Sequence, residues 1–168
     1  DGARWQQIFK QGKPTGALRR LGGARGSGTT VFFRPDATIF PKTTFDADLI
    51  AERLEIASYL HKGVKIVFDD EKSSRKQVFS NENGLFDYLQ RMLHNRSVAS
   101  VHESPFALTR THAESNTKID LALLWTEATD EHLRSYVNGI PTSSGGTHEN
   151  GFRAGIGKAI RNFVVTHS

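Results

Sequence analysis

Apolar residues at three- and four-residue spacing predict a first helix over residues 46–60, because such spacing places them on one helical face. Either Thr43 or Thr44 can cap its start, and two aspartates in the first turn suit the positive end of the helix dipole. Gly63 follows the last apolar position and can adopt the left-handed conformation that ends a helix. The pattern therefore predicts both ends of this helix and its buried face.

Two further helices are predicted in the second half of the chain. A short one covers residues 84–94. The other follows a loop at residues 140–146, starts at a cap on Thr147, and contains Gly155 and Gly157. Each glycine costs about 1 kcal/mol relative to alanine, so we expect packing or close backbone approach to justify it. The face expected to be buried consists of Phe152, Ile156, Ala159, Ile160 and Phe163.

Short runs of β-branched and aromatic residues, bounded by polar or glycine-rich turns, predict strands. A glycine-rich connection at residues 21–28 precedes one of them, and polar turns are expected at 69–76, 112–117 and 127–131. The mixture predicts an α+β fold, and a change of composition places a domain boundary near Gly84. The strands are expected at residues 4–9, 29–33, 64–68, 77–79, 106–110, 119–126 and 133–138.

The glycines Gly23, Gly26 and Gly28 have a spacing that superficially suggests a phosphate-binding loop. Such loops leave a strand and open a helix, so that backbone amides point at the anion. This segment instead leads into a predicted strand, and no Gly-Lys-Ser/Thr sequence follows it. We therefore interpret it as a flexible connection.

The composition describes a folded, mildly basic chain of 168 residues, enough for one or two domains. A net charge of +4 favours contact with a polyanion without requiring it. The chain contains no cysteine, which excludes disulfides and thiolate metal sites and makes the cytoplasm the expected compartment. No apolar run approaches the roughly 20 residues needed to cross a bilayer. The sequence begins without Met, as a fragment of a longer protein would.

Two stretches are similar to signatures of the B subunits of bacterial type IIA DNA topoisomerases, the gyrase B and topoisomerase IV B family. They are GTTVFFRPDATIF, from Gly28 to Phe40, and YVNGIPTSSGGTHENGFRAGIGKAI, from Tyr136 to Ile160. Within the second, GGTHENGF is the specific part. The predicted helix that ends in YLHKG and the Asp-Asp-Glu sequence after it also look like this family. The resemblance therefore covers nearly the whole chain.

This resemblance implies two domains. Residues 1–84 would be the C-terminal part of a GHKL-type ATPase domain, which is a sandwich of helices on a sheet. Residues 85–168 would be a transducer with a ribosomal protein S5 domain 2-like fold, incomplete at its C-terminus. Thr29 matches the threonine whose hydroxyl helps line the family's adenine pocket.

The same resemblance implies the activity of a parent protein. The parent would use ATP and Mg²⁺, form a homodimer of B subunits, and couple ATP hydrolysis to DNA strand passage together with an A subunit. The metal-holding, adenine-clamping and phosphate-covering motifs of the family do not occur in this chain. We therefore expect the chain by itself to bind no cofactor and to be inactive.

The segment Gly145, Gly146, Thr147 and His148 stands at a predicted helix start and has two interpretations. Free backbone amides at such a position can hold an anion. The alternative is a tight turn with a helix cap, in which His148 simply packs. We favour the structural interpretation, in which this coupling loop also senses the ATPase domain, a role suggested by analogy with the family.

Three basic residues, Arg153, Lys158 and Arg161, lie away from the predicted buried face of the last helix. Such a face can contact DNA phosphates, although solvated charge is the default on an outer helix face. The seven histidines lack the spacing of a helical zinc site, so no metal site is expected. The acidic residues at 69–71 are expected to form a solvated hairpin tip.

Two classes of function remain open from the sequence. The first is a fragment of an ATP-hydrolysing DNA topoisomerase, an isomerase. The second is a standalone nucleic-acid-binding or protein-interaction module without ATPase activity. The first predicts the missing ATPase motifs within about 150 residues before Asp1, roughly one domain length. Relatives of MutL or heat-shock protein 90 share the ATPase fold, but GGTHENGF is not one of their signatures.

Overall fold

The computed structural model describes residues 2–167 and contains helices and paired strands in alternation. Its internal contacts divide the chain into two compact units, Asp1–Asp46 and Ala47–Ser168. Every paired strand belongs to a two-stranded antiparallel ladder. The described part of the chain has no helix with the length and apolarity needed to span a membrane.

The first unit consists of two short ladders. Strand β1 (Ala3–Gln6) pairs with β4 (Arg19–Gly23), and β2 (Phe9–Lys10) pairs with β3 (Lys13–Pro14). The expected strand at 4–9 is therefore interrupted, while the turn expected after it is confirmed. Positive φ angles of 50° at Gln11 and 78° at Gly12 give that turn the left-handed geometry of a two-residue hairpin loop.

The strand expected at residues 29–33 is wrong, because this segment is irregular. Val31 and Phe32 are 79% and 84% exposed. Although β-branched and aromatic residues favour a strand, a ladder also needs a neighbour to accept its hydrogen bonds. None of the residues described in the structure pairs with this segment.

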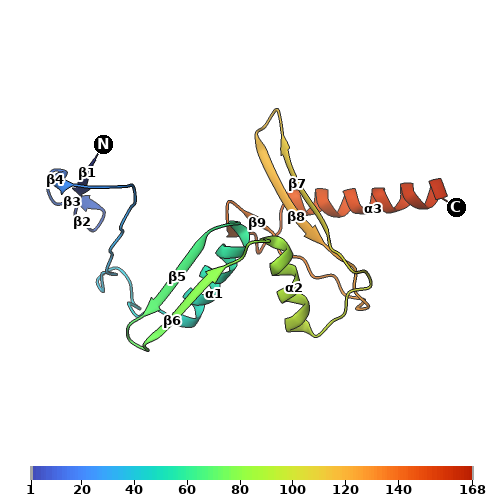
Figure 1. Cartoon of the computed structure of the whole chain (residues 1–168), viewed down its shortest axis with the longest axis horizontal. Helices are drawn as coiled ribbons and strands as arrows, with labels where there is room; N and C mark the ends of the chain where they lie inside the picture. Colours follow the sequence, from blue (N-terminus) through green and yellow to red (C-terminus); the bar gives the residue numbers. More distant parts are fainter. Residues whose placement is uncertain (1, 168) are drawn as a thin grey trace. The chain divides into compact units, whose positions relative to one another are not determined.

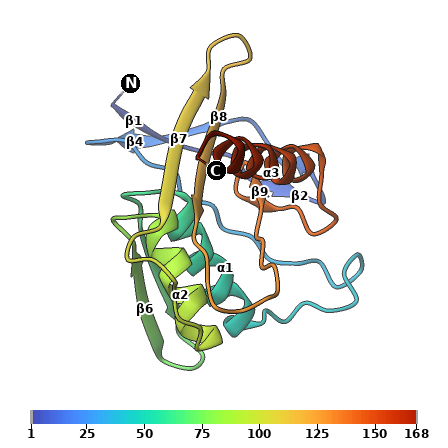
Figure 2. The same cartoon turned by 90° about the vertical axis from the view of Figure 1, so that its right-hand side faces the viewer.

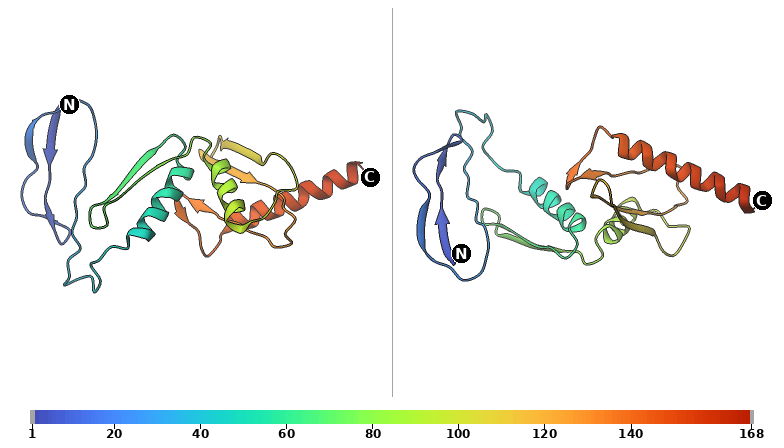
Figure 3. Two further views of the ribbon diagram at one scale, coloured as in Figure 1. Left: turned by 60° about the horizontal axis from the view of Figure 1, so that its bottom comes forward. Right: turned by 90° about the horizontal axis from the view of Figure 1, so that it is seen from above.

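The second unit begins with a helix packed on a hairpin. Helix α1 (Ala47–Leu60) contacts β5 (Lys65–Asp70) and β6 (Arg75–Ser80), as Figures 1 and 3 show. Ala51, Ser58 and Tyr59 are the buried residues of α1. The Ser58 hydroxyl donates to the Glu55 carbonyl at 2.6 Å and accepts from Asn81 at 2.6 Å. The predicted helix and hairpin are confirmed, and Gly63 follows the helix with a φ of 82°. The expected cap at Thr43 or Thr44 is wrong, because the helix begins at Ala47 and Asp46 therefore occupies the cap position.

Helix α2 (Leu85–Arg96) follows directly and contacts both α1 and β8. Its start requires glycine, because Gly84 has a φ of 58° and a Cβ there would lie 3.2 Å from the Tyr59 carbonyl oxygen. Strands β7 (Phe106–His112) and β8 (Thr117–Leu123) form a long hairpin whose turn end extends beyond α2 (Figure 2). The expected helix, both expected strands and the turn between them are confirmed.

The expected strand at 133–138 shortens to β9 (Tyr136–Val137), which pairs with β10 (Ile140–Pro141). Helix α3 (Thr147–His167) begins at Thr147, so Gly146 and not Thr147 occupies the cap position. Its expected buried face is wrong beyond its first turns. Ile160 and Phe163 are 48% and 64% exposed, because this end of the helix extends past the other elements of the unit (Figures 1 and 3).

Candidate functional site

The loop before α3 is a tight turn fixed by backbone hydrogen bonds. The Gly145 amide donates to the Thr142 carbonyl at 2.9 Å, and the Thr142 amide donates to the Ser135 carbonyl at 3.0 Å. Gly145 has a φ of 71°, a conformation that glycine adopts without steric cost. At Gly146, a Cβ would lie 2.7 Å from the Cε1 atom of His148, so a side chain there would have to displace the imidazole. The structure thus has a tight turn at this loop, with the His148 side chain exposed beside it.

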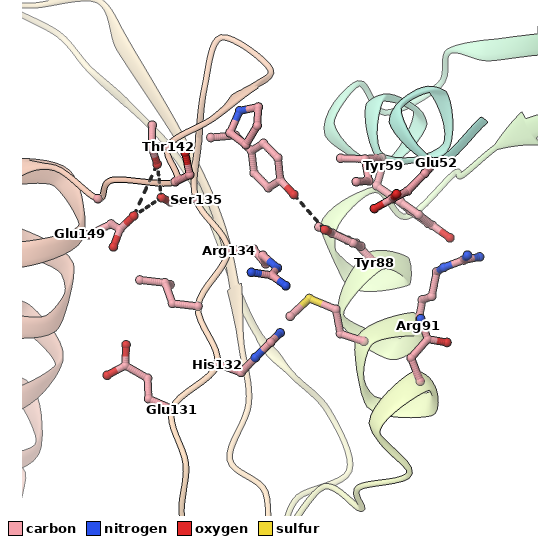
Figure 4. Close-up of a pocket in the computed structure, with 18 of the residues that line it drawn as sticks. Glu52, Tyr59, Tyr88, Arg91, Glu131, His132, Arg134, Ser135, Thr142 and Glu149 are labelled. Atoms are coloured by element: carbon pink, nitrogen blue, oxygen red, sulfur yellow. Dashed lines mark hydrogen bonds between the residues drawn. The ribbon is translucent and has the colours of Figure 1, made fainter. Parts of the chain in front are cut away.

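Glu149 ties the start of α3 to the residues on either side of the β9–β10 hairpin. Its side chain is only 14% exposed and accepts hydrogen bonds from the hydroxyls of Ser135 and Thr142, the latter at 3.4 Å (Figure 4). The Nη1 atom of Arg153 donates to its other carboxylate oxygen at 3.3 Å. The pKa of Glu149 is lowered, first by the hydrogen bond from Ser135 and then by Arg153 and His148.

Ser135, His148 and Glu149 do not have the geometry of a hydrolase triad. In a triad the imidazole lies between the hydroxyl and the carboxylate, so that it can remove the hydroxyl proton. Here the Ser135 hydroxyl donates directly to Glu149, and His148 Nε2 lies 3.4 Å from the same hydroxyl oxygen. His148 Nε2 is also 3.3 Å from the Thr142 hydroxyl oxygen. This cluster therefore holds the loop in place and does not activate a nucleophile.

The three predicted basic residues of α3 have different surroundings. Arg153 is engaged by two carboxylates, with its Nε and Nη2 atoms 2.9 and 2.7 Å from Glu131 and its Nη1 atom bonded to Glu149. The hydrogen bond to Glu131 is the main cause that raises the pKa of Arg153. Lys158 and Arg161 are exposed and form no ion pair with any residue from 2 to 167. The latter two are thus the basic side chains of α3 that are open to a phosphate.

An open groove of about 1020 Å³ lies beside the loop within the second unit. Its walls come from α1, α2, the segment at 131–136 and the start of α3 (Figure 4). Arg91 and Glu55 both line the groove and form an ion pair, which ties α2 to α1. Burial, followed by the nearby charges of Arg134 and Arg96, lowers the pKa of His132.

Tyr59, Tyr88 and Tyr136 meet along the wall of this groove. The rings of Tyr59 and Tyr88 are stacked, with centroids 5.1 Å apart and planes 12° apart. The ring centroids of Tyr88 and Tyr136 are 6.4 Å apart, and their hydroxyls are hydrogen-bonded at 2.8 Å. Burial is the main cause that raises the pKa of Tyr88, and the bond to Tyr136 adds to it.

Thr29 lies in the other unit, within the exposed irregular segment. The structure gives its hydroxyl no hydrogen bond among the residues that are described. The described residues also contain no group of three or more His, Asp or Glu side chains arranged to hold a metal ion.

The residues that fix the loop were only partly visible in the sequence. Glu149 had a signal, because an acidic residue at the third helical position is typical of a helix start. Ser135 and Thr142 had none, since hydroxyl residues are common in loops. The tyrosines are separated by 29 and 48 positions, which follow from their numbers, so no periodic pattern relates them.

Comparison with known proteins places the chain in a family. A sequence model described as DNA gyrase B matches residues 84–168, just over half of the chain. The chain is 30% identical to the B subunit of DNA gyrase from Clostridium acetobutylicum over 98% of its own length and 25% of that protein. It is also 30% identical to the B subunit of DNA topoisomerase 4 from Bacillus subtilis, over 98% of its own length and 24% of that protein. The chain thus spans about a quarter of these two relatives.

A solved structure gives the same result for the fold. The crystal structure of the ATPase domain of Thermus thermophilus gyrase B, in complex with an aminocoumarin, matches 99% of this chain and 45% of that chain. The TM-score is 0.80 and the sequence identity is 30%. The mixed helix-and-strand fold expected from the sequence is confirmed, as is the resemblance on which it rested. The chain belongs to the DNA gyrase B family.

Proposed function

We propose that this chain is part of the B subunit of an ATP-dependent type II DNA topoisomerase. Its parent would couple ATP binding and hydrolysis to the passage of one DNA duplex through another, giving supercoiling, relaxation or decatenation. The observation that carries the proposal is the similarity to gyrase B and topoisomerase 4 B subunits along 98% of the chain. Because the chain spans about a quarter of those relatives, the complete activity is attributed to a longer parent.

The proposed domain arrangement assigns residues 1–84 to the end of the ATPase domain and residues 85–168 to the transducer. It is supported by the family match, which starts at residue 84, the position where the composition changes. Gly84 also lies between β6 and α2, where the backbone turns with a φ of 58°. The internal packing of this chain divides at a different place, Asp46, because α1 contacts its hairpin on one side and α2 on the other.

The proposed roles of individual residues follow this arrangement. Thr29 would contact the adenine of ATP, and its exposed hydroxyl is consistent with that role. Gly145, Gly146, Thr147 and His148 would form the coupling loop, which their fixed geometry supports. Lys158 and Arg161 are the stronger candidates for DNA contact, since Arg153 is already bonded to two carboxylates.

The proposed cofactors and partners belong to the parent. It would bind ATP and Mg²⁺, form a B-subunit homodimer, and act on DNA with a topoisomerase A subunit in the cytoplasm. This chain alone supplies no catalytic residue in the proposal, since the family motifs that hold Mg²⁺ and activate water do not occur in its sequence.

Linking-number measurements on closed circular DNA test the proposal. The parent B subunit mixed with its A subunit should change the linking number only when ATP and Mg²⁺ are present. The same mixture with this chain in place of the parent should leave the DNA unchanged. An ATP-independent change, or no change with the parent, would contradict the proposed activity.

A further inference from the structure

All the tyrosines of the chain, three in number, lie at one contact within the second unit. They come from three different elements: Tyr59 from α1, Tyr88 from α2 and Tyr136 from β9. Figure 4 shows Tyr59 and Tyr88 on neighbouring helices, with the Tyr88 hydroxyl bonded across the groove. The contact therefore links the end of α1 to the β9–β10 hairpin through α2.

A second contact joins the same two elements. His61 directly follows α1, and its Nε2 atom lies 3.2 Å from the position that a Cβ on Gly139 would occupy. Gly139 is in the two-residue turn between β9 and β10, where its φ is 79°. Any other residue there would be strained and would press on the imidazole. The hairpin thus lies close to the residue after α1 at its turn and contacts α2 through Tyr136.

The hairpin depends on these contacts for its position. Strands β9 and β10 have two residues each, and so short an isolated hairpin is not stable in water. Its far end continues into Thr142, whose amide is bonded to the Ser135 carbonyl at 3.0 Å. Since Glu149 then ties Ser135 and Thr142 to α3, displacing the hairpin displaces the coupling loop with it.

We propose that Tyr88 and Tyr136 are positioning residues, which hold the hairpin and its coupling loop against α1 and transmit movements of α1 to that loop. The proposal rests on the proposed function, in which α1 belongs to the ATPase domain and the loop to the transducer. The hydrogen bond between the Tyr88 and Tyr136 hydroxyls is the contact that such a movement would break. It lies at the wall of an open groove, where water can replace either partner, while the stacked rings of Tyr59 and Tyr88 keep α1 and α2 together.

Hydrogen exchange on this chain tests the contact itself. Tyr136→Phe and Tyr88→Phe each remove one hydroxyl and keep the ring. Because a neutral hydrogen bond changes an opening equilibrium by about five-fold, we expect the amides of residues 137–142 other than Pro141 to exchange about five-fold faster in either variant. The double variant should exchange no faster than the single ones, since both remove the same bond.

Tyr59→Phe is the matched control, because it removes a hydroxyl that faces Glu55 at 3.3 Å and not the hairpin. It should leave exchange at residues 137–142 unchanged, and β5–β6 amides should be unaffected in all variants.

Chain labelled with fluorotyrosine gives a second readout, since only three fluorine signals are present. Tyr136→Phe should shift the Tyr88 signal strongly and the Tyr59 signal weakly. Unchanged exchange at the hairpin, or acceleration throughout the unit, would overturn the proposal.

Experiments on the full-length parent test whether movements of α1 reach the coupling loop through these tyrosines. With the A subunit present, Tyr136→Phe should leave ATP hydrolysis without DNA unchanged and slow the ATP-dependent change in DNA linking number by about five-fold, the factor expected for one hydrogen bond. An undiminished rate of linking-number change in an active parent would overturn this inference while leaving the proposed function standing. A wild-type parent that neither hydrolyses ATP nor changes DNA topology would instead refute the proposed function.

Discussion

Glu149 carries the most closely surrounded carboxylate of the site, and its ionised form is the one that its neighbours stabilise. Ser135 and Thr142 donate to it, and Arg153 pairs with it. Its pKa in the folded chain is lowered from the ordinary value of 4.5. A carboxylate with a lowered folded pKa contributes stability above its unfolded pKa and loses it as the pH falls through the folded value.

We therefore predict that Glu149→Gln destabilises the chain at neutral pH and that the difference from wild type shrinks below pH 4.5. Urea denaturation at a series of pH values measures this difference. Glu114→Gln is the matched control, because Glu114 is exposed in the β7–β8 turn and should give little difference at any pH. A Glu149→Gln effect that is independent of pH would mean that packing, and not charge, fixes the loop.

Thr29 is the residue on which nucleotide contact is proposed. In the parent, Thr29→Ala should weaken binding of an ATP analogue by about five- to ten-fold, the usual effect of losing one hydrogen bond. Thr29→Ser keeps the hydroxyl and should bind nearly as well as wild type. Equal affinity of all three proteins, measured by calorimetry, would remove Thr29 from the adenine pocket.

At the scale of elements, two glycines of the α3 region are predicted to respond in opposite ways to alanine. Gly155 is in the helix, and a Cβ there meets nothing within 4 Å. Gly155→Ala should thus stabilise the chain by about 0.5–1 kcal/mol through helix propensity. Gly145→Ala should destabilise it by about 1 kcal/mol, because a φ of 71° is strained for alanine.

Thermal unfolding of both glycine variants beside wild type checks this pair. The expectation that packing justifies Gly155 came from the sequence, and the described residues show open space there instead. If Gly155→Ala lowers the stability, a contact at this face must exist in solution that the described residues do not provide. If Gly145→Ala is neutral, the turn must relax more easily than its φ suggests.

Elements were predictable where their partners are close in sequence. The α1 helix, the β5–β6 and β7–β8 hairpins and α2 followed from periodicity and turn residues, because each packs on its neighbour. The prediction fails at residues 29–33 and at the C-terminal end of α3, where apolar side chains stay largely exposed. It also fails at residues 21–23, which were expected in a flexible connection and belong to β4. Local patterns report which residues favour burial, but only tertiary contacts decide whether a partner is present.

At the scale of the whole molecule, the family could be predicted because its specific motif, GGTHENGF, is contiguous. The tyrosine contact could not, because its members are brought together only by the packing of α1, α2 and β9. The loop itself was placed correctly at the start of a helix. What remained hidden was how Ser135 and Thr142 tie it to Glu149.

The net charge of +4 gives a prediction for DNA contact in the parent. Lys158→Glu combined with Arg161→Glu should weaken DNA binding and reduce the salt dependence, by roughly 0.9 in the log–log slope for each phosphate that the protein no longer neutralises. Lys72→Glu, which reverses an exposed charge at the β5–β6 turn, is the control. An equal effect from Lys72→Glu would show that overall charge and not the α3 face governs binding.

In the proposed function, this chain helps to couple ATP binding to DNA strand passage, but it does not contain a complete ATP-binding site. Calorimetric titration of Mg²⁺ with a non-hydrolysable ATP analogue tests it most directly. The titration is made into this chain and into a longer chain of the parent that adds one domain at each end. We predict binding by the longer chain alone. Binding by this chain, or by neither, would contradict the claim.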